Sequence, residues 1–448
     1  MNISDFKNKK CTVIGMGVSN TPLVEWLLKK EAIVTVRDKK GYDGLTDKAK
    51  SLIDRGVELI GGEDYLCDID ADYVFRTPGL RYDHPELIKA CEKGAVLTSE
   101  MELFFELCPC HIAAVTGSDG KTTTTTLISK LLGTIAKVYL GGNIGQPLLS
   151  FVEEMKPEDW AVLELSSFQL HTMKRSPEIA VITNLSPNHL DYHKDYGEYV
   201  DAKKNIFLHQ KPGDKLVLNY KNEDTRALSS LAADGVNLLY FNGNEGVVEK
   251  DGAIYVGEDK ILDTKDILLP GHHNIENYMA AIGATYPLVS KEPIAELAKS
   301  FGGVEHRLEL VRVKDEVKYY NSSIDSSPSR TTAALSSFTQ KVICILGGYD
   351  KKIPFEPLAK PLCEHCKLAV LTGATRDKIR IAVENSEEYK RSPFEMITEP
   401  DFDKAVECAV ANAKPGDIVV LTPSCASFDA FPNFMKRGEH FKELIRNL

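Results

Sequence analysis

The sequence predicts an α/β protein of three domains, each a doubly wound sheet covered by helices. Two observations lead to this prediction. Short apolar runs, several of them ending in glycine, alternate along the chain with helical segments, which is the pattern of buried parallel strands joined by crossover helices. The chain has 448 residues, more than one hydrophobic core usually supports.

The expected strands fall into three sets. The helix-like run TSEMELFFEL follows the first set, and the glycine pair of KSFGGVEHRLE interrupts the pattern before the third, as domain boundaries often do. We therefore expect domains at residues 1–100, 101–303 and 304–448. The expected strands are CTVIG, AIVTV, DYVF, HIAAVTG, WAVLEL, IAVITN, KLVLN, KVICILGG, LAVLTG and DIVVLTP, and the expected helices are TPLVEWLLKK, TTTTTLISKLLG, IENYMAAIGATYPLV and FDKAVECAVANA.

Between residues 237 and 269 the strands become shorter and turn residues become more frequent. The Asp251-Gly252 pair in VVEKDGAIYVGE predicts a tight β-hairpin. We expect this segment to be an addition to the middle domain.

Composition and charge exclude several classes of protein. The formal net charge of −11, from 54 Lys and Arg against 65 Asp and Glu, has the wrong sign for a general nucleic-acid binder. No segment approaches the roughly 18 to 20 consecutive apolar residues of a membrane span. The start, MNISDFKNKKCTVIG, lacks the apolar stretch of a signal peptide. We expect a cytoplasmic protein, most simply a monomer, that binds neither nucleic acid nor membrane.

The ten cysteines are scattered through the chain, which favours reduced thiols over a disulfide framework. Two clusters have ligand residues at short spacing, Cys-Pro-Cys-His at residues 108–111 and Cys-Glu-His-Cys at residues 363–366. Neither has a matching second pair at the distance of a zinc site. The sequence therefore favours ordinary thiols over structural zinc.

The most specific motif is HIAAVTGSDGKTTTTTLISKLLG, in which an apolar strand runs through a glycine loop into a helix. Such glycines let backbone N–H groups close on phosphate oxygens, while the lysine adds a cation and a threonine hydroxyl can hold Mg²⁺. The general motif has a further glycine where this chain has Val115. We predict a nucleoside triphosphate site in the loop formed by Gly117, Ser118, Asp119, Gly120, Lys121 and Thr122.

A second, incomplete glycine motif lies near the start of the chain. CTVIGMGVSNTPLVEWLLKK contains Gly15 and Gly17 between a strand and a helix, and the next strand ends at Asp38, which is the spacing of a dinucleotide fingerprint. The third glycine is replaced by Asn20. A dinucleotide, another nucleotide-linked ligand and a strand–helix turn without a ligand all remain open for this segment.

Acidic and imidazole groups follow two strands of the middle domain. Glu164 ends WAVLE, and His189 and Asp191 follow IAVITN, so all three lie at the edge where ligands bind in open α/β sheets. Mg²⁺ takes oxygen ligands, and one carboxylate with one loop hydroxyl and phosphate oxygens would suffice. The alternative for each residue is a helix cap or a surface group.

These residues resemble the Mur ligase family, in particular its glutamate-adding members. The resemblance spans nearly the whole chain, because its motifs occur in the family's order. It implies a Rossmann-like N-terminal domain that holds UDP, a P-loop ATPase-like central domain, and a Rossmann-like C-terminal domain that brings the amino acid. The motifs are VTGSDGKTT, GGNIGQPL, LELSSFQL, NHLDYH, AKKNIF, LPGHHNIEN, EHRLE, GGYDK and TPSCASFDAFPNFMKRGEHF.

The resemblance implies an ATP-dependent ligase that joins D-glutamate to UDP-N-acetylmuramoyl-L-alanine in peptidoglycan precursor synthesis. An acyl phosphate would form on the alanine carboxylate, and the amine of glutamate would displace phosphate from it. The residues implied for the UDP substrate are Val18, Ser19, Asp38, Lys39, Gly79, Asn143, Ser166 and His189. Those implied for ATP are Gly117, Ser118, Asp119, Gly120, Lys121, Thr122, Thr123, Asn274 and Arg307.

Lys203 in AKKNIF matches the lysine that is carbamylated in this family. A carbamate would turn a cation into a carboxylate, and two Mg²⁺ ions are implied, with Thr122, Glu164, His189 and Lys203 as metal ligands. The residues with implied catalytic roles are Lys121, Lys203 and His189. Lys351, Ser427 and Phe434 match residues that recognise glutamate.

The chain departs from the family at residues 321–327, Asn-Ser-Ser-Ile-Asp-Ser-Ser, where the family commonly has Asn-Asp-Ser-Lys-Ala-Thr-Asn. Ser322 and Ile324 replace the family's Asp and Lys, so a positive charge near the expected glutamate site is missing. Lys351 remains, and Arg330 is the candidate to supply the second charge.

Other functions are less compatible with the sequence. Sister ligases that add alanine, a diamino acid or a dipeptide, and folate polyglutamate synthetases, share the phosphate loop, but ELSSFQL and the SCASFDAFPNF run favour glutamate. An NAD-dependent dehydrogenase would leave the phosphate loop unexplained. A nucleotide sensor without enzymatic activity would release no phosphate when both acceptor and amino acid are supplied.

Overall fold

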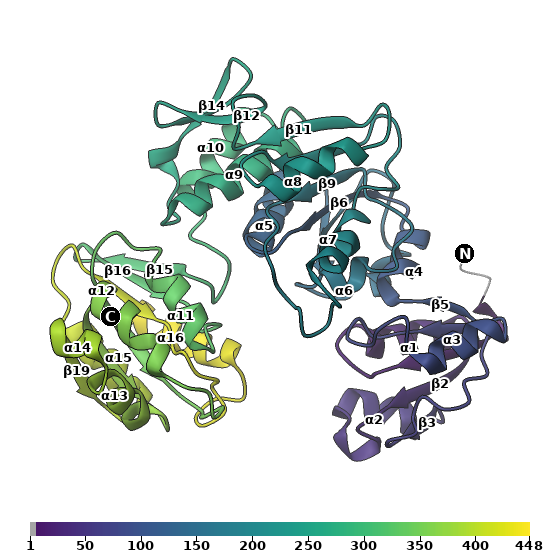
Figure 1. Cartoon of the computed structure of the whole chain (residues 1–448), viewed down its shortest axis with the longest axis horizontal. Coiled ribbons are helices and arrows are strands. Elements are labelled where there is room, and N and C mark those ends of the chain that lie inside the picture. The colour runs from purple at the N-terminus through teal and green to yellow at the C-terminus, as the bar shows by residue number, and fades with distance from the viewer. Residues whose placement is uncertain (1–5) are drawn as a thin grey trace. The chain divides into compact units, whose positions relative to one another are not determined.

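The computed structural model describes residues 6–448 and contains three sheets (Figure 1). The first five residues, part of the start on which the cytoplasmic expectation rests, lie outside this description. The chain folds into two compact units. The first runs to Thr264 and includes Glu276–Leu297, and the second comprises Lys265–Ile275 and Ala298–Leu448.

The first sheet has the order β3-β2-β1-β4-β5 with all strands parallel, which is a Rossmann-like arrangement. Helices α1 and α2 cover one face and α3 covers the other, because their apolar residues join different core clusters. The elements are β1 (Lys10–Ile14), α1 (Asn20–Lys29), β2 (Ile33–Asp38), α2 (Asp47–Asp54), β3 (Glu58–Gly61), β4 (Tyr73–Phe75), α3 (Pro85–Glu92) and β5 (Val96–Thr98).

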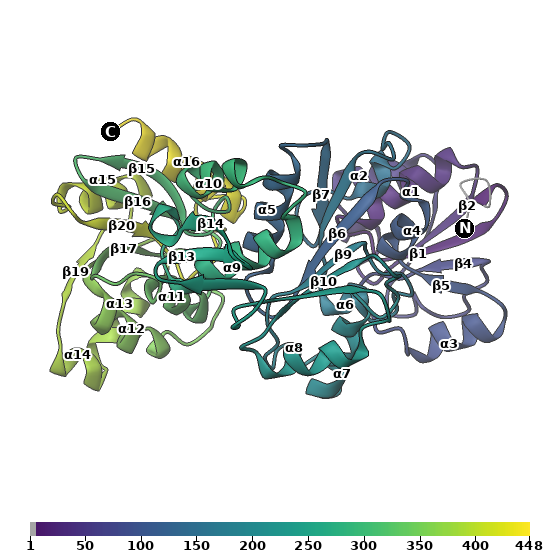
Figure 2. The ribbon, with the colours of Figure 1, turned by 90° about the horizontal axis from the view of Figure 1, so that it is seen from above.

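The second sheet has nine strands in the order β14-β13-β12-β11-β10-β9-β6-β8-β7. Helix α5 packs on β6, β7 and β8, and Figure 2 shows α6, α7 and α8 on the other side of these strands. The strands are β6 (His111–Thr116), β7 (Val138–Gly142), β8 (Trp160–Glu164), β9 (Ile179–Ile182), β10 (Lys215–Asn219), β11 (Asn237–Phe241), β12 (Val247–Lys250), β13 (Ala253–Val256) and β14 (Asp259–Asp263). The helices are α4 (Glu100–Leu107), α5 (Lys121–Leu132), α6 (Ser167–Leu170), α7 (Tyr196–Lys204), α8 (Glu223–Leu228), α9 (His272–Thr285) and α10 (Lys291–Ser300).

The hairpin expected at Asp251-Gly252 is present between β12 and β13, where Lys250 pairs with Ala253. Both turn residues have positive φ, 50° and 72°, as a two-residue hairpin turn requires. Strands β12 to β14 continue the edge of the central sheet, so the segment extends that sheet.

The third sheet, with the order β15-β16-β20-β17-β18-β19, is parallel except for the β15–β16 pair. Helices α12 and α13 cover one face, and α15 and α16 cover the other. The elements are β15 (Glu309–Lys314), β16 (Val317–Asn321), α11 (Pro328–Leu335), β17 (Val342–Gly347), α12 (Ala359–His365), β18 (Cys366–Thr372), α13 (Arg376–Glu384), α14 (Glu387–Arg391), β19 (Glu395–Thr398), α15 (Phe402–Ala411), β20 (Ile418–Leu421) and α16 (Phe434–Arg446).

The predicted α/β class with three doubly wound sheets is confirmed. Strands β3, β7, β15 and β19 lie at sheet edges. Their side chains are only partly buried, as in β3 and β15, so these strands lack the long apolar runs that mark the central ones. Within residues 6–448 none of the helices combines the length and the apolar character needed to span a bilayer.

Candidate active site

The predicted phosphate loop joins β6 to α5 and has little room for side chains. Gly117 has a φ of 149°, and a Cβ there would lie 1.9 Å from Thr183 Oγ1. Gly120 has a φ of 77°, and its Cβ would lie 2.3 Å from Asn277 Oδ1. Only glycine fits either position without displacing a neighbour. The loop backbone is therefore packed closely between the end of β9 and helix α9.

Three polar contacts join the loop to residues outside it. Ser118 Oγ donates to Ser186 O at 3.0 Å and lies 2.8 Å from the Tyr199 hydroxyl. The backbone N–H of Asp119 donates to Asn184 Oδ1 at 2.9 Å. Because all three contacts come from the connection after β9 or from α7, that region and the loop are held together.

Lys121 begins α5 and folds back over the loop. Its Nζ donates to the carbonyl oxygens of Gly117 and Ser118 at 2.9 and 2.8 Å. Thr122 and Thr123 follow on the first turn of the helix, where backbone N–H groups and the helix dipole favour an anion. The ammonium and the helix terminus together provide the positive potential that a phosphate chain needs.

Asn143 and Glu164, at the carboxyl ends of the neighbouring strands β7 and β8, meet Thr122 on the first turn of α5. The buried Glu164 carboxylate accepts from Thr122 Oγ1 at 2.6 Å and from Asn143 Nδ2 at 2.7 Å. A hydroxyl and a carboxylate oxygen at this spacing are donors of the kind that Mg²⁺ prefers. The donor set fits a hard cation beside the phosphate loop.

Lys203, on α7, is buried next to the strand that enters the loop, with only 2% of its surface exposed. Its Nζ donates to Gly117 O at 2.8 Å and to Thr116 Oγ1 at 3.0 Å. Burial, and then the charge of Lys121, lower the pKa of Lys203 well below its ordinary value. A lower pKa increases the fraction of neutral amine at Lys203, and its carbamylation stays a prediction.

His189 lies in the loop after β9 and has a φ of 55°. Partial burial lowers the pKa of His189, Asp191 raises it, and the charges of Lys121 and Lys203 lower it further. The imidazole is therefore kept neutral, the form that binds metals. The structure brings His189 into the electrostatic neighbourhood of Lys121 and Lys203, and its role toward metal and substrate stays a prediction.

Ser166, by contrast, is engaged in capping α6. Its hydroxyl accepts from Gln169 N at 3.3 Å, and Gln169 Oε1 accepts from Ser166 N at 3.0 Å. This reciprocal capping box fixes the start of the helix. Its role toward the substrate stays a prediction.

The first-domain residues predicted for the UDP substrate lie at or just after the carboxyl ends of β1, β2 and β4, which are adjacent strands of the first sheet. Val18 is 81% exposed, Ser19 precedes α1 without capping it, and a Cβ on Gly79 would meet nothing within 4 Å. Lys39 pairs with Glu63 at 3.2 Å. These residues form an accessible edge, and their contact with UDP stays a prediction.

The incomplete glycine motif has a structural explanation. Asn20 Nδ2 donates to Ile14 O and Gly15 O, each at 2.9 Å, and Asp38 Oδ2 accepts from Met16 N at 2.8 Å. Asn20 thus ties α1 to the end of β1, and the Asp38 carboxylate closes the turn between them. Asp38 could not be assigned to this backbone contact from sequence spacing.

Asn274 and Arg307 belong to the second unit. Asn274 Nδ2 donates to Pro270 O at 2.6 Å, and Arg307 N donates to Val304 O at 2.9 Å across a tight turn. Their contacts with ATP stay predictions. Asn277, on the same helix as Asn274 but in the first unit, was not anticipated, although it accepts from Thr124 Oγ1 at 3.2 Å and faces Gly120.

Of the residues predicted for glutamate, Phe434 begins α16, Ser427 lies in the segment before it, and Lys351 lies in the loop after β17. Lys351 Nζ donates to Ser326 O at 3.3 Å, and the Phe434 ring lies 5.9 Å from that of His306. The Ser427 hydroxyl is buried and has no hydrogen-bond partner within residues 6–448. Such a hydroxyl can receive a ligand at little cost.

Arg437 was not anticipated, and it organises this region. Its buried guanidinium donates to the carbonyl oxygens of Ser323, Cys425 and Ala426 at 2.9 to 3.1 Å. Burial lowers the pKa of Arg437 to about 10. The arginine thus joins the segment after β16 to the segment that carries Ser427.

Side-chain hydrogen bonds also hold the segment that departs from the family. Ser322 Oγ accepts from Leu308 N at 3.1 Å, and Thr422 Oγ1 donates to Asp325 Oδ2 at 3.0 Å. Burial raises the pKa of Asp325 to about 6, and Arg307 and Arg330 lower it. Arg330 itself is exposed and donates to Ile324 O at 3.2 Å. This contact places a cation beside Ile324, the position at which the family commonly has lysine.

The fold and the loop define a P-loop nucleotide-binding protein of three α/β domains. Residues 9–99 match the Mur ligase MurD-like N-terminal domain, residues 115–285 the Mur ligase middle domain, and residues 306–425 the Mur ligase glutamate ligase domain. The chain therefore belongs to the Mur ligase family, and the resemblance predicted from the motifs is confirmed.

Two named relatives are similar in sequence to the chain over nearly its full length. The chain is 49% identical over 456 residues to the UDP-N-acetylmuramoylalanine--D-glutamate ligase of Ruminiclostridium cellulolyticum, covering 99% of this chain and 98% of the relative. It is 48% identical to the enzyme of the same name from Clostridium novyi, covering 99% and 97%.

Two solved structures are similar to the chain in fold. The UDP-N-acetylmuramate-alanine ligase MurC of Thermotoga maritima matches with a TM-score of 0.59 at 18% identity, covering 98% of this chain and all of that one. MurF of Acinetobacter baumannii matches with a TM-score of 0.59 at 15% identity, covering 100% and 92%.

Proposed function

We propose that the chain is an ATP-dependent ligase that joins D-glutamate to UDP-N-acetylmuramoyl-L-alanine during peptidoglycan precursor synthesis. The observation that carries this proposal is the full-length identity of 47–49% to ligases named for that reaction. The site supports it with a phosphate loop, an oxygen donor set for a cation and a buried lysine, placed at one edge of the central sheet.

We assign binding functions to each of three domains, at residues 1–100, 101–303 and 304–448. The first binds UDP through Val18, Ser19, Asp38, Lys39 and Gly79. The second binds ATP at residues 117–123 and the muramoyl-alanine end through Asn143, Ser166 and His189. Asn274 and Arg307 add contacts to ATP, and Lys351, Ser427 and Phe434 receive glutamate.

Two Mg²⁺ ions would be held by Thr122, Glu164, His189 and a carbamylated Lys203, and they would supply positive charge to the phosphate oxygens. The carbamate would form when the Lys203 amine adds to carbon dioxide, making an N–C bond and releasing one proton. The low pKa of Lys203 supports this step. The remaining work of the protein is positioning and charge neutralisation, to which Lys121 contributes most directly.

The alanine carboxylate would attack the γ-phosphoryl group of ATP, forming an acyl phosphate and releasing ADP. The amine of glutamate would then attack the acyl carbon, forming the amide bond with loss of a proton and of phosphate. No protein nucleophile is needed. The test is phosphate release with UDP-N-acetylmuramoyl-L-alanine and a panel of D- and L-amino acids. We expect release to require D-glutamate. Preference for a neutral or a diamino acid would overturn the assignment, and preference for L-glutamate would change the substrate but keep the mechanism.

A further inference from the structure

Two arginines fasten the loop that follows β4 to connections of the central sheet. Arg76 is 1% exposed. Its guanidinium donates to Leu80 O at 3.1 Å, and on its other side to Phe168 O at 3.2 Å and to Thr172 Oγ1 at 2.9 Å. The loop that contains Gly79 is thereby tied to α6.

Arg81 makes a more extensive set of contacts on the other end of this loop. Nε and Nη2 donate to the two oxygens of Asp83 at 2.8 Å, and Nη1 and Nη2 donate to the two oxygens of Glu198 at 2.9 Å. Nη1 also donates to Tyr192 O at 2.7 Å. All five N–H donors of the guanidinium are used, which fixes its plane.

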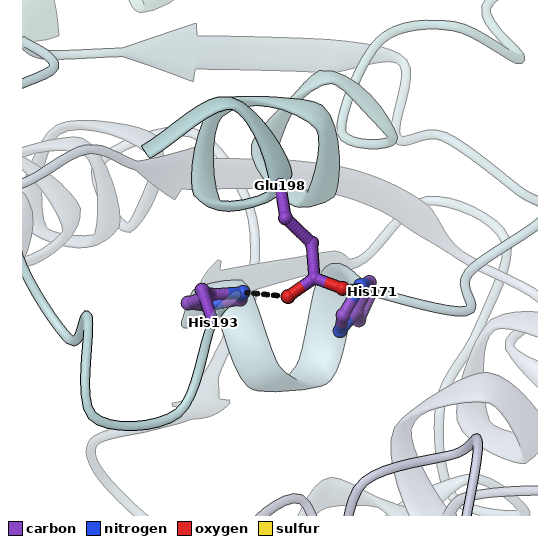
Figure 3. Close-up of side chains that lie close together, drawn as sticks. All are labelled: His171, His193 and Glu198. Atoms are coloured by element: carbon purple, nitrogen blue, oxygen red, sulfur yellow. Dashed lines mark ion pairs between the residues drawn. The ribbon is translucent and has the colours of Figure 1, made fainter. Parts of the chain in front are cut away.

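Two histidines lie against the same carboxylate. Figure 3 shows that the rings of His171 and His193 approach different oxygens of Glu198, with nitrogen–oxygen distances of 3.8 and 3.6 Å. These three residues have the spacing of a metal site. However, both carboxylate oxygens already accept from Arg81, and Oε2 also accepts from Lys194 N at 2.7 Å. The Arg81 guanidinium therefore already supplies the positive charge that a metal ion would bring to the Glu198 carboxylate.

The surroundings make this ion pair stronger than a surface pair. Burial lowers the pKa of His171 to about 4 and also lowers that of His193, so both rings are neutral. Together with Tyr82, Phe168 and Tyr192 they form a cluster of packed rings around the pair. The Arg81 and Glu198 side chains are 24% and 15% exposed, and this partial exclusion of water strengthens the attraction between the guanidinium and the carboxylate.

The partners of Arg81 belong to the elements that carry the candidate catalytic residues. Tyr192 N donates to His189 O at 3.1 Å, which closes the turn that His189 begins. Glu198 lies on α7, the helix that ends with Lys203 and Lys204. The Tyr192 hydroxyl donates to Pro78 O, in the loop that contains Gly79, at 3.2 Å. A continuous set of contacts therefore joins Gly79 to His189 and to the helix of Lys203.

We propose that Arg81 is a positioning residue that couples binding of the uridine-bearing substrate at the Gly79 loop to the placement of His189 and Lys203. This inference rests on the proposed function, because it assumes that UDP binds at the first sheet. Substrate would order the loop, the loop would hold Arg81, and Arg81 would hold the turn at His189 and helix α7. The site would thus be completed when the correct acceptor is present.

Hydrogen exchange with UDP as the probe tests this coupling without relying on activity. UDP alone should slow amide exchange several-fold in residues 188–204 of the unmodified protein. In Arg81→Lys, which keeps the charge but lacks the planar fork, and in Glu198→Gln, UDP should still bind but change exchange there less than twofold. Arg175→Ala is the matched control, because Arg175 also forms a two-point pair with Glu106, at 2.7 and 2.6 Å. It should behave like the unmodified protein.

Steady-state kinetics provide the second readout. At saturating UDP substrate, the kcat of Arg81→Lys should be about tenfold or more below that of the unmodified protein. The affinity of the variant for ATP should stay within twofold of the unmodified value. UDP binding that leaves exchange in residues 188–204 unchanged in the unmodified protein would overturn the coupling alone. The same loss of kcat in Arg175→Ala would show a general effect of instability and also overturn it. Failure of UDP to bind the unmodified protein would overturn the proposed function and the coupling together.

Discussion

The Nζ of Lys203 lies 2.8 Å from the carbonyl oxygen of Gly117, so an amine from α7 closes on the first residue of the phosphate loop. The two residues are separated by 86 positions in the chain. Because the lysine is buried beside a second ammonium, its pKa falls well below the ordinary value. The contact links this amine to the place where the phosphates of ATP are expected.

Lys203→Ala should reduce ligation by about 100-fold or more, because the site loses the carboxylate expected to hold a cation. Acetate or formate in the buffer should restore part of the activity by taking its place. Lys204→Ala is the matched control, since Lys204 is its neighbour and pairs with Asp201; it should retain nearly full activity. Full activity of Lys203→Ala at saturating Mg²⁺ would refute the carbamate.

Lys121→Ala should lower kcat by about 100-fold or more and leave the fold intact, because it removes a charge next to the transferred phosphoryl group. Phosphate release and circular dichroism measure the two effects. Lys130→Ala, a change of the same kind at the far end of α5, should have little effect. Near-normal turnover in purified Lys121→Ala would exclude the assigned ATP site.

Glu100 predicts a specific dependence of stability on pH. Burial raises the pKa of Glu100 to about 7, whereas an unfolded glutamate ionises near 4.3. Between these values the native state binds more protons than the unfolded state. Stability should therefore fall as the pH rises from about 5 to 7, by at most about 1.4 kcal/mol per pH unit.

Glu100→Gln should remove this contribution, so that its melting temperature relative to the unmodified protein rises between pH 5 and pH 8. Glu92→Gln, at an exposed position, should show no such trend. A difference between Glu100→Gln and the unmodified protein that does not vary with pH would contradict the predicted ionisation. Calorimetry over this pH range makes the measurement.

Arg330→Ala should raise the KM for glutamate more than the KM for ATP, by about tenfold, because one charge-assisted contact to a dicarboxylate is lost. The exposed guanidinium lies next to Ile324 and influences Asp325, which suits it to replace the lysine that the family has there. Arg391→Ala, on α14, is the control. Equal changes in both KM values would argue against a role in glutamate binding.

The fold class and the chemistry of the phosphate loop follow from the order of residues along the chain. Alternation of apolar runs with helices specifies parallel sheets, since a strand buried on both faces must be apolar throughout. The spacing of Gly117, Gly120 and Lys121 is local, and local geometry follows from local residue types. The hairpin at Asp251-Gly252 was predictable for the same reason.

Which distant groups meet depends on how the elements pack in three dimensions. Lys203 is buried because α7 packs against the end of β6, and nothing in the residues around it predicts that depth. Asp38 closes a backbone turn at Met16, Arg437 joins three carbonyl oxygens, and Arg81 reaches α7. Burial and charge depend on strand order and on packing between elements far apart in the chain. Periodicity specifies which face of an element is buried, but not which charge it will meet there.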